Sequence, residues 1–182
     1  MTLYRVFPYD AAARPSQLGG ALYAPRGAAG RIANPDLYDE LYLSSSPAGA
    51  LSEAFGRFDV WTQAMFAYHD GPYALATYEL PDRTEICGLD NAGRLLAYDL
   101  RPSGVVARER SVTQAWAARI HGSKKWIGIA WWSRYDSRWR SLALWNRKQL
   151  RLKEDPDVLS LAHPAVQEAA ELLPRRLDAR TG

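Results

Sequence analysis

The chain has 182 residues, 47% of them hydrophobic and 24% charged, which predicts one domain over residues 1–182 and excludes a disordered chain. Its net charge of +3 suits an anionic substrate or partner, although many proteins share this balance. Cys87 is the only cysteine, so an internal disulfide is excluded, and its apolar neighbours indicate a buried, inert thiol. The N-terminus lacks the apolar segment of a signal peptide, and no apolar run approaches the roughly 20 residues that span a bilayer, so we expect a cytoplasmic protein.

Two strands separated by a long loop are predicted in the first part of the chain. Leu3 to Tyr9 is β-branched and aromatic, which predicts a strand whose Arg5 points either into a site or into solvent. Residues 11–30 are rich in Ala, Gly and Pro and are predicted to be mostly loop. The glycines of this loop do not form the G-x-G-x-x-G fingerprint, so a Rossmann site is not indicated. The alternation in Glu40 to Ser44 predicts a strand with its two leucines on one face and Tyr42 on the other.

A helix is predicted immediately after the second strand. Ser46 is a natural N-cap, and Pro47 fits the first helical position. The helix is expected to run to about residue 58, with a core-facing stripe of Leu51, Ala54, Phe55 and Phe58. Glu53 lies on another face, where the small residues Gly49 and Ala50 leave room for a ligand to approach its carboxylate.

The remaining predicted elements show no regular βαβ alternation. Residues 62–68 are apolar and aromatic, and their type stays open. Strands are predicted at 74–80, 85–89, 94–99, 128–133 and 141–145, with 128–133 as a central strand. Helices are predicted at 111–120, with Val112, Ala115, Trp116 and Arg119 on one face, and at about 164–173. This order of elements indicates an α+β fold.

Glu53 is the first candidate for a chemical role. Breaking an N-glycosidic bond builds positive charge on the ribose, and a fixed carboxylate beside that carbon stabilises the charge. Pre-placed groups of this kind are worth roughly 3–4 kcal/mol each. The alternative is a helix-surface ion pair of Glu53 with Arg57 one turn later, worth only about 0.3–0.5 kcal/mol.

Three further residues could complete a nucleotide site. Arg31, Tyr42 and Glu53 follow one another at intervals of eleven positions. The guanidinium of Arg31 can bind phosphate oxygens bidentately, or it can be a solvent-facing loop residue. Tyr42 can stack on nicotinamide or a base, or it can be a core tyrosine. Ser133 follows an apolar strand and can bond a ribose or hold Glu53, or simply end the strand.

Other chemistries have weaker support in the sequence. The three histidines are isolated and there is a single cysteine, so no metal site is expected. No G-x-S-x-G motif appears, so a serine hydrolase is not indicated. Trp and Arg residues interleave between Trp126 and Lys153, a pattern that could stack on single-stranded RNA. A strand with one buried face explains this pattern equally well, so no direct nucleic-acid partner is expected.

Four segments in order resemble the RES domain family, named for an Arg, a Glu and a Ser. They are LYRV near the start, GRIANP, LYLSSSPAGALSE and GIAWWSR, and the resemblance covers about residues 3–145. The resemblance implies a fold similar to ADP-ribosyltransferases, with a split, mixed β core and flanking helices around a cleft for NAD. It also implies the toxin of a type II toxin–antitoxin pair that depletes NAD by cutting the nicotinamide–ribose bond.

The resemblance implies specific roles for the matching residues of this chain. Arg31 would hold the NAD phosphates, Tyr42 would pack on nicotinamide, Glu53 would be the essential carboxylate, and Ser133 would line the site. NAD would be a substrate, with no cofactor, and either water or inorganic phosphate would accept the ribosyl group. The protein partner would be an antitoxin of Xre type that occludes the site, and the oligomeric state is left open between a monomer and a homodimer.

Some alternatives stay open at this point. The family's Arg-aromatic-Asn piece reads Arg31-Ile32-Ala33-Asn34 here, so the role of Asn34 is undecided. Arg26 is a rival to Arg31 for the phosphates. The same fold could serve an ADP-ribosyltransferase that modifies a macromolecule, and a non-catalytic nucleic-acid-binding module is the alternative outside enzymes.

Overall fold

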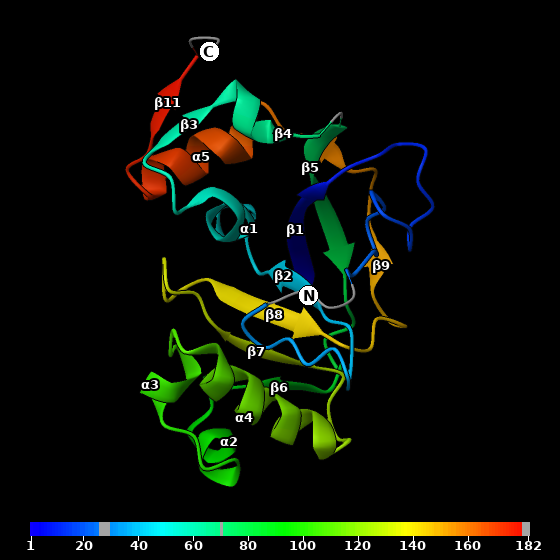
Figure 1. The fold of residues 1–182 in the computed structure, drawn as a ribbon, viewed down its shortest axis with the longest axis vertical. Coiled ribbons are helices and arrows are strands. Elements are labelled where there is room, and N and C mark those ends of the chain that lie inside the picture. The colour runs from blue at the N-terminus through cyan, green and yellow to red at the C-terminus, as the bar shows by residue number, and fades with distance from the viewer. Residues whose placement is uncertain (26–29, 70, 180–182) are drawn as a thin grey trace.

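A twisted, mixed β-sheet organises the computed structural model, which describes residues 1–25, 30–69 and 71–179 (Figure 1). Arg26 lies outside the described residues. Seven strands follow one another across the sheet: β10 (Asp157–Val158), β5 (Gly71–Glu79), β1 (Thr2–Pro8), β2 (Leu41–Ser44), β8 (Arg140–Leu144), β7 (Gly128–Trp132) and β6 (Ile86–Gly88). The short strands β4 (Ala67–Tyr68) and β9 (Arg151–Leu152) also pair with β5.

The sheet is split between β1 and β2. β1 pairs with β5 over seven residue pairs, whereas the only registered pair between β1 and β2 is Tyr4 with Ser44. The strands diverge from that point, so β1 and β5 run across the direction of β7 and β8 in Figure 1. β6 and β7 are parallel and the other pairs of this sheet are antiparallel, which confirms the expected split, mixed β core of an α+β fold.

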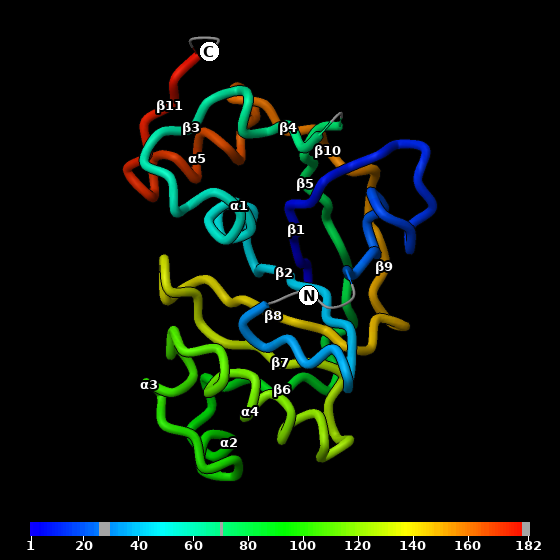
Figure 2. Tube along the Cα trace, viewed as in Figure 1, coloured from blue at the N-terminus to red at the C-terminus, as the bar shows by residue number. Residues whose placement is uncertain are grey.

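Helices cover the sheet at two opposite ends of the molecule (Figure 2). At one end, α1 (Pro47–Phe55) packs on α5 (Pro164–Leu172), close to the 3₁₀ turn η1 (Gln63–Phe66) and a parallel pair of strands, β3 (Val60–Thr62) and β11 (Arg176–Asp178). At the other end, α2 (Ala92–Ala97), α3 (Pro102–Val105) and α4 (Arg110–Gly122) lie beside β6 and β7. The opening of the sheet therefore lies between two helical layers.

The start of α1 forms as the sequence predicts, and its end comes earlier. The Ser46 hydroxyl accepts a hydrogen bond from the backbone N–H of Gly49 at 2.9 Å, and Pro47 occupies the first turn. The helix ends at Phe55, and Phe58, expected in the core stripe, is 39% exposed. The apolar stripe is completed instead by Trp61, whose indole N–H donates to the carbonyl of Phe55 at 3.1 Å.

The prediction of a strand at 94–99 is wrong, because this stretch lies mostly in α2. The Asn91 side chain caps the helix by accepting from the backbone N–H of Arg94 at 3.0 Å. Arg, Leu and Ala are strong helix formers, so the local sequence supports this outcome. Leu96 is 81% exposed, although its apolar side chain is typical of a buried strand.

α4 forms where it is predicted, but its buried face is shifted by one position along the chain from the predicted one. Thr113, Trp116, Ala117 and Ile120 are buried, whereas Val112 is exposed. This face packs with β6 and β7 around Cys87, which is fully buried as predicted, and burial raises the pKa of its thiol to about 11. The strand at 128–132 lies inside the sheet between β8 and β6.

The tryptophans between Trp126 and Lys153 are part of the core. Trp131 and Trp139 are buried, and Trp126, Trp132 and Trp145 are partly buried hydrophobics packed against the cluster around β6, β7 and α4. Burial in the core therefore accounts for these tryptophans, but strand alternation does not, because only Trp131 and Trp132 lie in a strand and β7 is buried at consecutive positions.

Candidate active site

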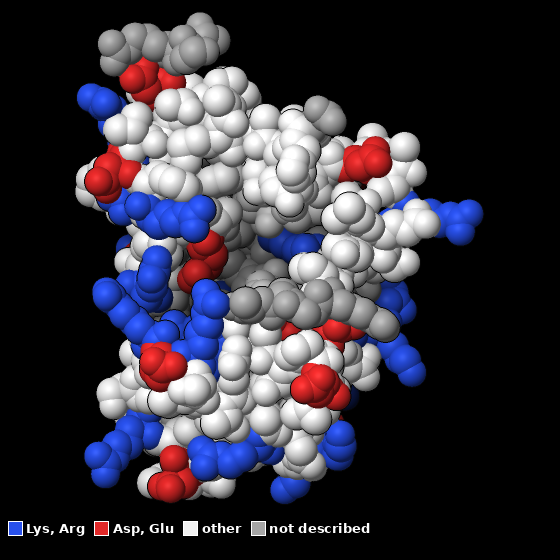
Figure 3. Space-filling model, in the orientation of Figure 1, with Lys and Arg blue, Asp and Glu red and all other residues white. Residues whose placement is uncertain are grey.

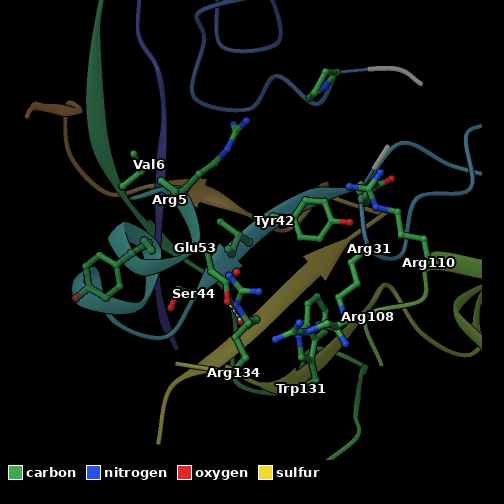
Figure 4. A pocket seen from close by; sticks show the side chains of 18 of the residues that line it. Arg5, Val6, Arg31, Tyr42, Ser44, Glu53, Arg108, Arg110, Trp131 and Arg134 are labelled. Carbon is green, nitrogen blue, oxygen red and sulfur yellow. Dashed lines mark hydrogen bonds between the residues drawn. The ribbon is translucent and has the colours of Figure 1, made fainter. Parts of the chain in front are cut away.

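A cavity of about 910 Å³ opens where the sheet splits between β1 and β2 (Figure 4). Side chains from β1, β2, α1, β7, β8 and the segment 107–110 line this cavity, which we call the main cavity. Arg31, Tyr42 and Glu53 all lie on its wall, so the structure brings together three of the four residues singled out in the sequence. The fourth, Ser133, lies behind Glu53.

Glu53 is held in place by two buried serines. The hydroxyl of Ser133 at the end of β7 donates to its Oε1 at 3.2 Å, and that of Ser141 on β8 donates to the same atom at 3.3 Å. Ser133 and Ser141 are 3% and 4% exposed, whereas Glu53 itself is exposed towards the cavity. Neither bond uses Oε2, so that oxygen is available to a ligand in the cavity.

The alternative of a surface ion pair between Glu53 and Arg57 does not match the described residues. They contain no ion pair between the two side chains, and the guanidinium of Arg57 lies over the Phe58 ring, 4.6 Å from its centroid. Of the two small residues before Glu53, Ala50 lines the cavity as expected. Gly49 does not leave open space, because a Cβ there would lie 2.3 Å from the Ser44 hydroxyl.

Arg31 is bonded to protein backbone as well as lining the main cavity. Its Nη2 donates to the carbonyls of Val105 and Ala107 at 2.9 and 2.8 Å. The Thr113 hydroxyl in turn donates to the carbonyl of Arg31. Burial lowers the pKa of Arg31, and the negative charge of Glu53 opposes this effect. Arg31 therefore fastens the segment 105–107 beside the cavity, a role that its spacing in the sequence did not indicate.

Tyr42 lines the main cavity with its ring edge-on to Trp131, at 6.4 Å between centroids and an interplanar angle of 88°. Its hydroxyl accepts from the backbone N–H of Ile32 at 3.2 Å, and burial raises its pKa above the ordinary range. Gly30 passes so close that a Cβ there would lie 2.4 Å from this hydroxyl, so a glycine is required. The tyrosine joins the loop 30–34 to β2.

Asn34 braces the same loop rather than lining the cavity. Its side-chain amide lies within hydrogen-bonding distance of the carbonyls of Ile32 and Gln114, at 3.2 and 3.1 Å, and of the Tyr38 hydroxyl at 2.9 Å. These contacts connect the loop to α4.

Several residues on the cavity wall were not singled out by their position in the sequence: Glu40, Arg108, Arg110, Trp131 and Ser141. Arg134 also lies there, and Arg5 points into this site rather than into solvent, with its Nη1 donating to the carbonyl of Ala21 at 3.0 Å. Isolated arginines are common on surfaces, and Ser141 meets Glu53 only through the pairing of β8 with β2 and β7. The described residues contain no group of three or more His, Cys, Asp or Glu that could hold a metal ion.

Glu40 is a buried carboxyl that forms no ion pair with any described cation. It is 6% exposed, and no described residue bonds its Oε1. Burial raises its pKa, with a smaller opposing contribution from its hydrogen bonds with its own backbone and with Tyr42. A carboxyl whose pKa is raised by folding stabilises the fold most below its ordinary pKa, and this contribution is lost as the pH rises through the raised value.

We therefore expect Glu40→Gln to raise the free energy of unfolding at pH 7 by on the order of 1 kcal/mol, because the buried charge is removed. The gain should shrink as the pH falls and Glu40 of the wild type becomes protonated. Urea unfolding of both proteins at pH 7 and at pH 4.5 measures the difference, with the exposed Glu79→Gln as control. A gain that is larger at pH 4.5 would contradict this assignment.

The fold and the opening of the sheet define the class of this protein. It is an α+β protein whose split, mixed sheet carries an acidic residue and several arginines at its opening. The family model described as the RES domain matches residues 2–166, and the chain belongs to this family. No curated protein matches the chain.

A solved structure, the crystal structure of the M.tuberculosis MbcT-MbcA toxin-antitoxin complex, shares the fold. One chain of that complex is similar to this one with a TM-score of 0.63 and 19% identity. The similarity covers 95% of this chain and 88% of that chain. Among residues 1–25, 30–69 and 71–179, no helix has the length and apolar character needed to cross a membrane.

Proposed function

We propose that this protein cleaves the bond between nicotinamide and ribose in NAD and is the toxin of a toxin–antitoxin pair. The observation that carries the proposal is the carboxylate of Glu53, held by two buried serines at the wall of a cavity that five arginines also line. Membership of the RES domain family and the toxin–antitoxin complex among similar structures support it.

In this mechanism different residues of the main cavity stabilise the developing charge, position the carboxylate and bind the substrate. When the glycosidic bond breaks, its electron pair moves to the nicotinamide nitrogen and positive charge develops on the ribose. Glu53 stabilises that charge, and Ser133 and Ser141 keep its carboxylate in place. Arg108, Arg110 and Arg134 offer cations for the phosphates of NAD, and the ring of Tyr42 offers a face for nicotinamide.

The reaction is tested by incubating purified protein with NAD and identifying the products by mass, with and without inorganic phosphate. Release of free nicotinamide with ADP-ribose, or with its phosphorylated form, supports the proposal and names the acceptor. ADP-ribose found on a protein or nucleic acid would instead indicate a transferase. Intact NAD under all conditions would exclude NAD cleavage by the isolated protein.

The proposed partner is an antitoxin of Xre type that covers the main cavity. Induction of the protein in a bacterial host should arrest growth and lower cellular NAD, and induction of the Glu53→Gln variant should do neither. Growth arrest that persists with this variant would separate toxicity from the proposed reaction.

The role of the two serines in positioning Glu53 can be tested by a substitution that leaves the Glu53 carboxylate unchanged. Hydrogen bonds to charged groups are worth about 1.5–3 kcal/mol, so Ser141→Ala should lower kcat for NAD about tenfold to a hundredfold with little change in KM. The exposed Ser16→Ala is the matched control and should keep full activity. A kcat for Ser141→Ala within twofold of the wild type would show that this bond does not position Glu53.

A further inference from the structure

The C-terminal segment of the chain lies next to the end of the helix that carries Glu53. β11 (Arg176–Asp178) pairs in parallel with β3 (Val60–Thr62), the strand that follows α1, and both lie at the end of the molecule where α1 packs on α5 (Figure 1). The RES domain model matches residues 2–166, so β11 lies outside the match. Residues that the family model does not include therefore adjoin the support of the candidate active site.

Arg175, immediately before β11, binds the last turn of α1. Its Nη2 donates to the carbonyl of Gly56 at 2.8 Å, and its Nη1 pairs with the carboxylate of Asp59 at 3.4 Å. Gly56 is the C-cap of α1, so its carbonyl lies beyond the last helical N–H and needs another donor. A cation at this end of a helix also opposes the partial negative charge of the free carbonyls. Glu53 lies in the same last turn, so Arg175 fixes the part of the helix from which its carboxylate projects.

A second contact joins the end of α1 to a serine that holds Glu53. A Cβ on Gly56 would lie 2.7 Å from two ring carbons of Tyr135, so this ring packs directly on the backbone of the helix end. The backbone N–H of Tyr135 donates to Oγ of Ser133 at 3.2 Å, and that hydroxyl donates to Oε1 of Glu53, also at 3.2 Å. A movement of the helix end would therefore displace both the backbone of Glu53 and the ring next to its serine partner.

Arg175 also lines a second cavity, of about 720 Å³, that shares a wall with the main cavity. The arginines of this second cavity are Arg31, Arg57, Arg108, Arg134 and Arg175. Figure 3 shows Lys and Arg side chains gathered at one side of the hollow in this face of the molecule. Within the described parts of the chain, Arg175 is the one arginine of this group that is paired with a carboxylate. It does not line the main cavity, so its contacts indicate a role within the protein and not at a ligand in that cavity.

We propose that Arg175 is a positioning residue for Glu53, so that the C-terminal segment is a working part of the active site. The inference rests on the proposed function. A carboxylate stabilises the charge that develops on the ribose only from the place at which it is held, and a misplacement of about 1 Å can cost on the order of a hundredfold in rate. Ser133 and Ser141 hold the Oε1 atom, whereas Arg175 holds the turn of helix behind it. Both restraints are needed, because a side chain fixed only at its tip still moves with its backbone.

The first experiment measures nicotinamide release by Arg175→Met, at a temperature where thermal unfolding shows every variant to be folded. Methionine keeps a long side chain but donates no hydrogen bond, so the end of α1 is released. We expect kcat to fall about tenfold, with KM for NAD within about twofold of the wild type. Arg175→Lys keeps a cation that can donate to the carbonyl of Gly56 and should recover part of kcat. An unchanged kcat in Arg175→Met overturns the proposal.

Arg176→Met is the matched control for this substitution. Arg176 is exposed, and its backbone N–H donates to the carbonyl of Asp59 at 3.1 Å, a bond that does not depend on the side chain. It lines neither cavity, so kcat should stay within about twofold of the wild type. Amide hydrogen exchange at residues 54–58 should increase in Arg175→Met and not in Arg176→Met. Equal losses of kcat in both variants, or unchanged exchange in Arg175→Met, would overturn the proposal.

The second experiment determines whether Arg175 acts through Glu53. In the Glu53→Gln background no charge remains to be positioned, so Arg175→Met should lower the residual rate of nicotinamide release by less than about twofold. A tenfold loss that persists in this background, or a rise in KM for NAD in Arg175→Met alone, would show that Arg175 acts on the ligand and would refute the positioning role. These outcomes leave the proposed function standing, whereas intact NAD with the wild type removes the proposed function and the positioning role together.

Discussion

Replacement of Glu53 by glutamine should remove NAD turnover while the protein stays folded. The amide has nearly the same shape and its carbonyl can still accept from Ser133 and Ser141, but it carries no charge to stabilise the developing cation on the ribose. Loss of one pre-placed electrostatic group typically lowers kcat about a hundredfold to a thousandfold, and we expect the upper end. The rate of nicotinamide release at saturating NAD measures the effect.

The control for this prediction is Glu168→Gln, because Glu168 is an exposed glutamate on α5 that does not line the main cavity. Glu53 is exposed to the cavity, so the thermal midpoints of both variants should lie within about 2 °C of the wild type. Normal turnover by Glu53→Gln would show that the mechanism is wrong. A large drop in the midpoint would indicate that the carboxylate has a structural role instead.

Replacement of Arg31 by alanine should raise KM for NAD about tenfold to a hundredfold. Two contributions are lost together, the positive charge on the cavity wall and the hydrogen bonds from Nη2 to the carbonyls of Val105 and Ala107. Each bond from a charged donor is worth about 1.5–3 kcal/mol, and without them the segment that carries Arg108 and Arg110 is no longer fastened to the loop 30–34. Steady-state kinetics with NAD measure the change.

Arg31→Lys separates the two contributions. Lysine keeps the charge but lacks the planar guanidinium, so it cannot reproduce the same pair of contacts to the carbonyls. If fastening the segment is the main role, Arg31→Lys should recover little of the loss in KM, and hydrogen exchange at residues 105–110 should increase in both variants. Full recovery by lysine with unchanged exchange would show that charge alone matters. Arg83→Ala provides the baseline for removal of an exposed arginine.

Much of the fold could be predicted because local signals and packing agree. The cap at Ser46, the proline at position 47 and the alternation in 41–44 each specify a local conformation that the structure contains. The strand predicted at 94–99 is wrong. Its leucines suggested burial in a strand, whereas its helix propensity and the Asn91 cap produce a short exposed helix. The end of α1 was misplaced because Phe58 is exposed beyond the helix, whereas Trp61, six residues after Phe55, is buried against the Phe55 ring.

The sequence by itself determined the type and order of most elements, the family, and the four residues Arg31, Tyr42, Glu53 and Ser133 as candidates. Only the tertiary structure decided how they act, because contacts between residues some 80 positions apart depend on strand pairing. The single pair joining β1 to β2 opens the main cavity, and the register of β8 brings Ser141 to Glu53. The arginines around the main cavity come from β1, the start of α4 and separate loops, and no local pattern records their proximity.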